Sequence, residues 1–169
     1  MYLKPILKNF HLHIIALTAN MKNLLIGNIT ADVFNTIKTN KLEKNLDVLG
    51  YVSHPEMIKN IAKSDLLLLL IPNTKKNLSI VQGKIFEYLA APKYIIGIRP
   101  KKGDSAKILT DAKAGEMFEF SDFEDLKSKI LEHYKNWQIK KPQLLNEKAL
   151  KNYTRKELTN KLTQLFNLI

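Results

Sequence analysis

Short apolar runs alternate with amphipathic stretches along most of the chain. The apolar runs have the length of buried strands, and the amphipathic stretches repeat with the period of a helix. The pattern predicts strands over residues 23–27, 47–50, 66–71, 94–98 and 117–120. It predicts helices over residues 30–39, 53–63, 80–91, 104–112 and 122–137, and a last helix after Pro142. Residues 12–17 fit a strand and a helix equally well.

This alternation predicts the α/β fold class, with a Rossmann-like parallel sheet and helices on both faces. The run Leu66–Ile71 is apolar throughout, as is typical of a strand covered on both sides. Because no linker divides the chain, we expect one domain over residues 1–169, with an atypical start over 1–20 and a C-terminal helix within 143–169. Ligands of such sheets bind at the carboxyl ends of the strands. Here those ends are residues 27–28, 50–52, 72–73 and 99–100.

The charge of the chain is strongly basic. It has 27 basic and 16 acidic side chains among 169 residues, a formal net charge of +11. Arg99 and Arg155 are its only arginines, and aromatic residues do not alternate with the basic ones, so no nucleic-acid partner is predicted. Residues 71–113 carry nine basic and three acidic side chains, more than half of the excess. This concentration favours a site that receives a small polyanion.

Other classes of function find little support in the composition. The absence of cysteine excludes a disulfide scaffold, a thiolate metal site and cysteine catalysis. No apolar run is long enough to cross a membrane and no signal-peptide cleavage site is apparent, so we expect a cytoplasmic protein whose membrane contact, if any, is peripheral. The acidic residues 122–125 lie at a helix start, where carboxylates favour the dipole, and the four histidines lack ligand spacing. No metal or cofactor is predicted.

The predicted helix Ile80–Ala91 is the strongest candidate for chemistry. We expect one side of it to pack on the sheet, formed by Val81, Ile85, Phe86 and Leu89. The other side is formed by Ile80, Gly83, Lys84, Glu87 and Ala91. Glycine costs a helix roughly 1 kcal/mol relative to alanine, so Gly83 indicates that something approaches the backbone closely. The free N–H groups of the first turn suit a phosphate, and Glu87, one turn further, suits the two hydroxyls of a ribose.

Three segments of the chain carry motifs in a specific order and spacing. They are Gly-Tyr-Val-Ser-His-Pro-Glu at 50–56, Ala-Lys-Ser-Asp-Leu-Leu-Leu-Leu at 62–69 and Gly-Lys-Ile-Phe-Glu-Tyr-Leu-Ala at 83–90. Asn-Tyr-Thr-Arg at 152–155 and the helix after it complete the pattern. Over residues 21–169 the chain resembles the carboxy-terminal half of GT-B-type glycosyltransferases of the large retaining group-1 family. That family includes sucrose synthases and many lipopolysaccharide and capsule enzymes.

The resemblance implies a domain that binds a nucleoside-diphosphate sugar as glycosyl donor. The implied binding residues are Tyr51, Val52, Val81, Gln82, Gly83, Lys84 and Glu87. By motif position, Glu87 matches the second glutamate of the family's Glu-x7-Glu signature, which holds the ribose. Residues 81–83 match the helix start whose backbone faces the donor phosphates, and residues 51–52 match the loop that receives the base. No catalytic residue is identified.

The chain also departs from the family pattern. The first glutamate of the signature would fall at Ser79, so that carboxylate is missing. Nothing before Asn23 matches the family's first strand and its Gly-Arg…Lys segment, and the amino-terminal acceptor domain is absent from this sequence. We therefore expect half of an enzyme that works with a separately encoded acceptor domain, or a fragment that began at an internal Met.

Two alternatives stay open beside this hypothesis. One is a non-catalytic nucleotide-binding or protein-interaction module that retains the fold. The other is a protein similar to nucleotide-sugar epimerases, which share the GT-B architecture. Because a donor domain without its first strand would expose a sheet edge, we also expect self-association, or exchange of the first 20 residues between copies.

Overall fold

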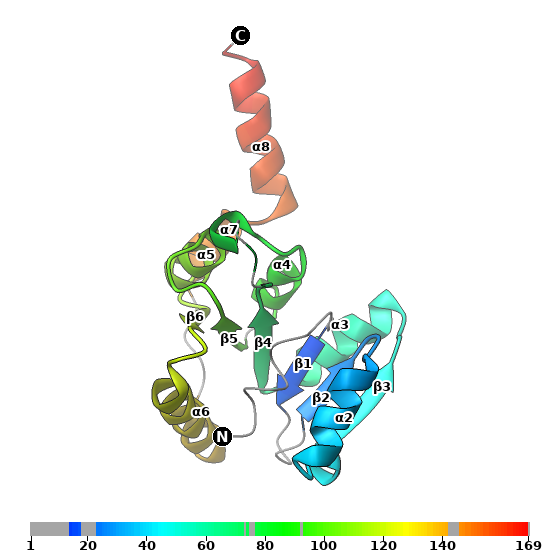
Figure 1. Cartoon of the computed structure of the whole chain (residues 1–169). Helices are drawn as coiled ribbons and strands as arrows, with labels where there is room; N and C mark the ends of the chain where they lie inside the picture. Colours follow the sequence, from blue (N-terminus) through cyan, green and yellow to red (C-terminus); the bar gives the residue numbers. More distant parts are fainter. Residues whose placement is uncertain are drawn as a thin grey trace.

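The computed structural model describes residues 14–17, 23–72, 74, 77–91, 93–141 and 146–168. Its strands are β1 (Ile14–Leu17), β2 (Asn23–Ile26), β3 (Leu46–Gly50), β4 (Leu66–Leu70), β5 (Tyr94–Ile98) and β6 (Gly115–Phe118). Its α-helices are α2 (Ala31–Thr39), α3 (His54–Lys63), α4 (Lys84–Leu89), α5 (Asp104–Asp111), α6 (Phe123–Gln138), α7 (Glu147–Lys151) and α8 (Arg155–Phe166). Two short 3-10 helices, η1 (Glu43–Asn45) and η2 (Asn77–Ser79), complete the list (Figure 1).

The strands form one six-stranded sheet in the order β3-β2-β1-β4-β5-β6. β2 pairs with β3 in parallel, and β4, β5 and β6 pair in parallel, so the α/β fold class is confirmed. β1 runs antiparallel to both β2 and β4, so the sheet is mixed and not wholly parallel as expected. Every strand except β1 therefore points the same way. The carboxyl ends of these five strands lie at one edge of the sheet, where ligands of α/β proteins bind.

β1 fills the central position of the sheet. Its backbone pairs Ile14 with Ile26 on one side and Ile15 with Leu68 on the other. β2 and β4 therefore expose no edge at this position. The expected self-association, or exchange of the first 20 residues between copies, stays a prediction. The remaining residues of 1–20 lie outside the described part of the chain.

Helices cover both faces of the sheet, as the continuous apolar run in β4 predicted. On one face, α3, α4 and α5 pack against the side chains of Leu67, Leu69 and Ile95. On the other face, α6 packs against Leu66, Ile96 and Phe118, and α2 covers Leu25. Successive residues of a strand point to opposite faces, so all five leucines of β4 meet apolar neighbours.

Local sequence signals account for several helix ends. Ser53 is the N-cap of α3, where its hydroxyl accepts the Glu56 N–H at 3.4 Å, and Pro55 lies in the first turn, as the capping pattern predicts. Thr30 precedes α2, in which Val33 and Ile37 are buried but Phe34 remains exposed.

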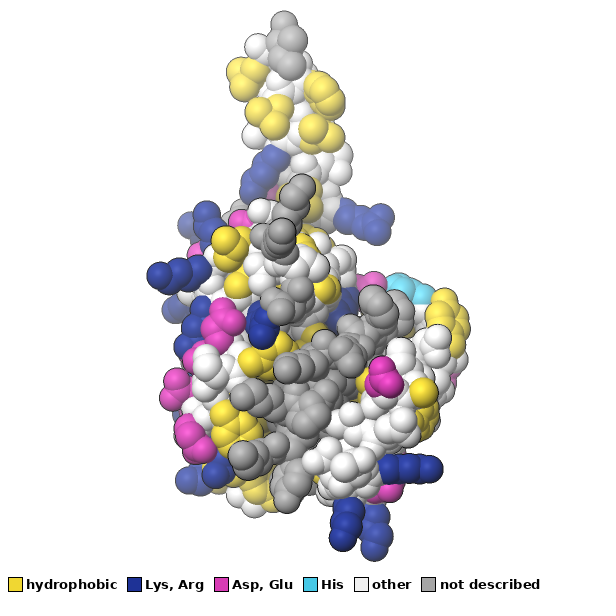
Figure 2. Space-filling model, in the orientation of Figure 1, with side chains coloured by type: hydrophobic (Ala, Val, Ile, Leu, Met, Phe, Trp, Pro, Cys, Tyr) yellow, Lys and Arg dark blue, Asp and Glu magenta, His cyan; other side chains and the backbone are white. Residues whose placement is uncertain are grey.

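The last part of the chain differs from the single helix expected after Pro142. It contains α7 and α8, separated by a turn at residues 152–154. α8 buries none of its side chains and projects away from the rest of the molecule (Figure 1). Its apolar residues are therefore open to solvent, as Figure 2 shows: they are Leu158, Leu162, Leu165 and Phe166. No helix in the described ranges is both long and apolar enough to span a membrane.

Candidate functional site

The helix that carries the strongest motif begins later than its sequence predicted. α4 starts at Lys84 and not at Ile80, with Gly83 as its N-cap. The preceding residues form other hydrogen bonds: the Ile80 N–H donates to the Asn77 carbonyl, and the Ser105 hydroxyl donates to the Ile80 carbonyl at 2.8 Å. These contacts hold Ile80 outside a helix. Val81 and Gln82 therefore lead into α4 and do not form its first turn.

The buried face of α4 is also different from the predicted one. Ile85, Tyr88 and Leu89 are 0–6% exposed, whereas Val81 and Phe86 are 37% and 38% exposed. The expected packing of Val81 and Phe86 on the sheet was wrong. Tyr88 takes their place because residues at i, i+3 and i+4 share a helix face. The Tyr88 hydroxyl donates to the Leu68 carbonyl oxygen at 3.4 Å, so the polar atom that this side chain brings into the core has a hydrogen-bond partner.

The opposite side of α4 holds the implied phosphate and ribose residues. A Cβ atom built on Gly83 would meet nothing within 4 Å, so the space on that side of the glycine is open. Lys84 follows it, and partial burial lowers the pKa of its ammonium group to about 8. The Glu87 side chain is 31% exposed. Gly83 and Glu87 thus border open space, whereas the Lys84 ammonium group between them is largely buried.

Glu87 makes a contact that the sequence did not indicate. Its Oε1 lies 3.1 Å from Nε2 of His54, in the first turn of α3. The contact joins residues 33 positions apart, so periodicity could not reveal it. The only available signal was that each residue belongs to one of the three motif segments.

The two residues of the implied base loop have different surroundings. The Tyr51 side chain is 90% exposed, directly after β3. Val52 is half-buried and packs against the core beneath α3 and α4. Gln82, on the approach to α4, has a buried Oε1 with no hydrogen-bond partner among the described residues. Tyr51 therefore offers a free ring, whereas Val52 can offer a base only its backbone and part of its side chain.

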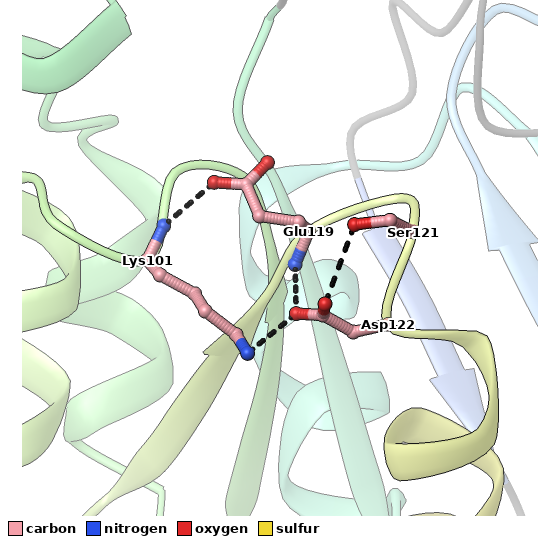
Figure 3. Close-up of polar contacts among 4 residues, drawn as sticks. All are labelled: Lys101, Glu119, Ser121 and Asp122. Carbon is pink, nitrogen blue, oxygen red and sulfur yellow. Dashed lines mark hydrogen bonds and ion pairs between the residues drawn. The ribbon is translucent and has the colours of Figure 1, made fainter.

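A second group of charges lies at the same edge of the sheet, after β5 and β6 (Figure 3). Lys101 Nζ lies 2.6 Å from Asp122 Oδ2, which also accepts the Glu119 N–H at 2.9 Å. The Lys101 N–H donates to Glu119 Oε1 at 3.1 Å, and Ser121 donates to Asp122 Oδ1. The hydrogen bond with Asp122 raises the pKa of Lys101, and the bond from Lys101 lowers the pKa of the Asp122 carboxyl. This network ties two loops together.

The basic residues of segment 71–113, which we expect to attract a polyanion such as a diphosphate, have different surroundings in the structure. Arg99 stacks its guanidinium over the Phe120 ring at 4.0 Å, and its Nε is buried without a partner among the described residues. Lys101 is engaged with Asp122, while Lys102 and Lys107 line an open hollow together with Ser79. Ser79, where the family's first glutamate would fall, is exposed in η2. Lys75 and Lys76 lie outside the described residues.

The remaining histidines and carboxylates do not come together. Within the described residues, no group of three or more histidine or acidic side chains could hold a metal ion. Asp122 of the acidic run 122–125 is the N-cap of α6 and is bound to Lys101. His133 stacks on Tyr94 at 3.8 Å, and burial lowers the pKa of its imidazole. His11 and His13 lie outside the described part of the chain.

Neither a scan against protein-family models nor a search of curated proteins finds a match to the chain. The likeness to glycosyltransferases therefore rests on the motifs at residues 50–56, 62–69 and 83–90. The contact between Glu87 and His54 links the first and third of these segments.

Proposed function

We propose that this chain is the donor-binding domain of a cytoplasmic glycosyltransferase and binds a nucleoside-diphosphate sugar without a metal ion. The observation that carries the proposal is the position of Glu87. Its carboxylate is partly exposed on α4, at the carboxyl edge of a parallel set of strands, next to the loop that follows β3. A carboxylate in such a place can accept hydrogen bonds from both hydroxyls of a ribose.

The surrounding residues supply the other parts of the site. The open space beside Gly83 suits the diphosphate, and the neighbouring Lys84 ammonium group adds positive charge there. The exposed Tyr51 ring suits a base by stacking. In this arrangement the domain holds the nucleoside diphosphate as it leaves with its negative charge. The acceptor substrate and a catalytic base would come from an acceptor domain outside this sequence.

Calorimetry with UDP, GDP and ADP tests the proposal. We expect one of them to bind, and Glu87→Gln to weaken it by about 10- to 150-fold, since charge-assisted hydrogen bonds contribute about 1.5–3 kcal/mol. Glu43→Gln, at an exposed carboxylate in η1, is the matched control and should leave the affinity unchanged. Failure of all three nucleotides to bind, or equal binding by wild type and Glu87→Gln, would refute the assignment.

A non-catalytic module that retains the fold is the second candidate, and Ser79 is the observation in its favour. The exposed hydroxyl of Ser79 cannot supply the negative charge of the missing glutamate. A domain of this kind would bind a nucleoside diphosphate or a protein partner without promoting release of the sugar. Incubation with UDP-, GDP- and ADP-sugars separates the two candidates. Slow hydrolysis that Glu87→Gln abolishes supports the transferase and excludes a module that does not promote release of the sugar.

A further inference from the structure

The contact between His54 and Glu87 connects two helices that follow different strands of the sheet: α3 follows β3 and α4 follows β4, with β2 and β1 between these strands. His54 belongs to the first turn of α3, and Glu87 lies in the middle of α4. Nε2 and Oε1 are 3.1 Å apart, with side chains 68% and 31% exposed. Among the described residues it is the only ion pair that involves a histidine. Since both partners still meet water, the pair contributes little to the stability of the fold.

The chemistry of the pair leaves the carboxylate available to a ligand. A carboxylate offers about four lone-pair positions on its two oxygens. Nε2 of His54 donates to Oε1 in the charged imidazolium and in the neutral tautomer that carries the proton on Nε2, and this bond uses one of those positions. One position on Oε1 and both on Oε2 remain, and a vicinal diol needs only two acceptors. His54 and a diol can therefore bind Glu87 at the same time.

We propose that His54 is a positioning residue for this site. It holds the Glu87 carboxylate in the orientation that receives the diol, so the flexible glutamate does not have to be ordered when the ligand binds. This role rests on the proposed binding of a nucleoside diphosphate at α4. It makes the site selective for ribonucleotides through a residue that does not itself contact the ribose.

Nucleotides with and without the diol distinguish this role from a general structural one. The tightest binder among UDP, GDP and ADP is compared with its 2′,3′-dideoxy form by calorimetry. His54→Ala should lower the affinity for the ribonucleotide about 3- to 10-fold and leave the affinity for the dideoxy form unchanged. His54→Gln, whose carboxamide N–H can also donate to Glu87, should recover most of the loss. Lys59→Ala, an exposed change on α3, is the control.

Each outcome bears on the inference. An unchanged or increased affinity of His54→Ala for the ribonucleotide overturns it, and so does an equal loss for both nucleotides. In those cases a loss in Glu87→Gln would leave the proposed function standing, so the two failures are distinguishable. If the wild type binds none of the three nucleotides, the proposed function fails and the positioning role fails with it. A loss that is specific to the diol and rescued by His54→Gln supports the inference.

Discussion

The hydrogen bond from Ser105 to Ile80 fixes the backbone of the segment just before α4, and a variant that lacks this bond tests how much it stabilises the fold. The Ser105 side chain is buried at 1% exposure, and its hydroxyl donates to the Ile80 carbonyl at 2.8 Å. Ser105→Ala deletes the donor and adds no bulk. Because water cannot reach the buried position to replace the donor, we expect the free energy of unfolding to fall by about 1–2 kcal/mol. For a chain of this size that corresponds to a lower Tm by about 2–8 °C.

Urea unfolding followed by circular dichroism measures the effect of Ser105→Ala. Ser121→Ala is the matched control, since it removes an exposed hydroxyl whose hydrogen bond to Asp122 can be replaced by water. We expect a lower unfolding midpoint for Ser105→Ala and an unchanged one for Ser121→Ala, with equal slopes. Equal midpoints for both variants would contradict the argument that this bond fixes Ile80. The cause of the late start of α4 would then lie elsewhere.

Three further changes test other parts of the structure. Gly115→Ala places a Cβ 1.9 Å from the Ile95 carbonyl oxygen, so the free energy of unfolding should fall by about 3 kcal/mol or more. The Cβ of Gly83→Ala meets nothing within 4 Å, so thermal unfolding of this variant should show a change of less than about 1 kcal/mol. A chain ending at Thr154 loses α8, which buries no side chain, and should keep the urea midpoint of the full chain; a clear drop would show that α8 supports the fold. The pKa of Lys84 falls from 10.5 to about 8 on folding, so the unfolded state binds more protons between those pH values. The stability of the wild type relative to Lys84→Gln should therefore rise from about pH 8 to 10.5, and a flat difference would contradict the burial of this charge.

The sequence predicted the elements of the fold well where the signal is local. Residues 94–98 form β5 with the predicted bounds, because a short apolar run between Pro92 and Pro100 leaves little choice. Ser53 and Pro55 predicted the start of α3 correctly, because capping of a helix depends only on residues close together in the sequence. The direction of β1 could not be predicted, since four apolar residues carry no information on which strands they pair with.

Contacts between distant residues explain what the sequence missed at the site. The start of α4 depends on Ser105, which lies 25 positions from Ile80. The partner of Glu87 lies 33 positions away. Tyr88 was not among the residues predicted to pack on the sheet, although its ring completes the face formed with Ile85 and Leu89. Helical periodicity placed Ile80, Gly83, Lys84, Glu87 and Ala91 on one side of the helix, but Ala91 is buried in the core and Ile80 packs against it. The role of Gly83, Lys84 and Glu87 in binding a donor stays a prediction.

An NMR titration of the labelled protein with the tightest-binding nucleoside diphosphate tests the location of the site most directly. Backbone amide shifts report which residues meet the ligand. We expect the largest changes at Tyr51, His54, Gly83, Lys84 and Glu87, and much smaller changes in Glu87→Gln at the same nucleotide concentration. Changes confined to the open hollow of Lys101, Lys102 and Lys107, with none on α4, would show that the basic loop after β5 binds the anion. That result would contradict the placement of a donor site on α4.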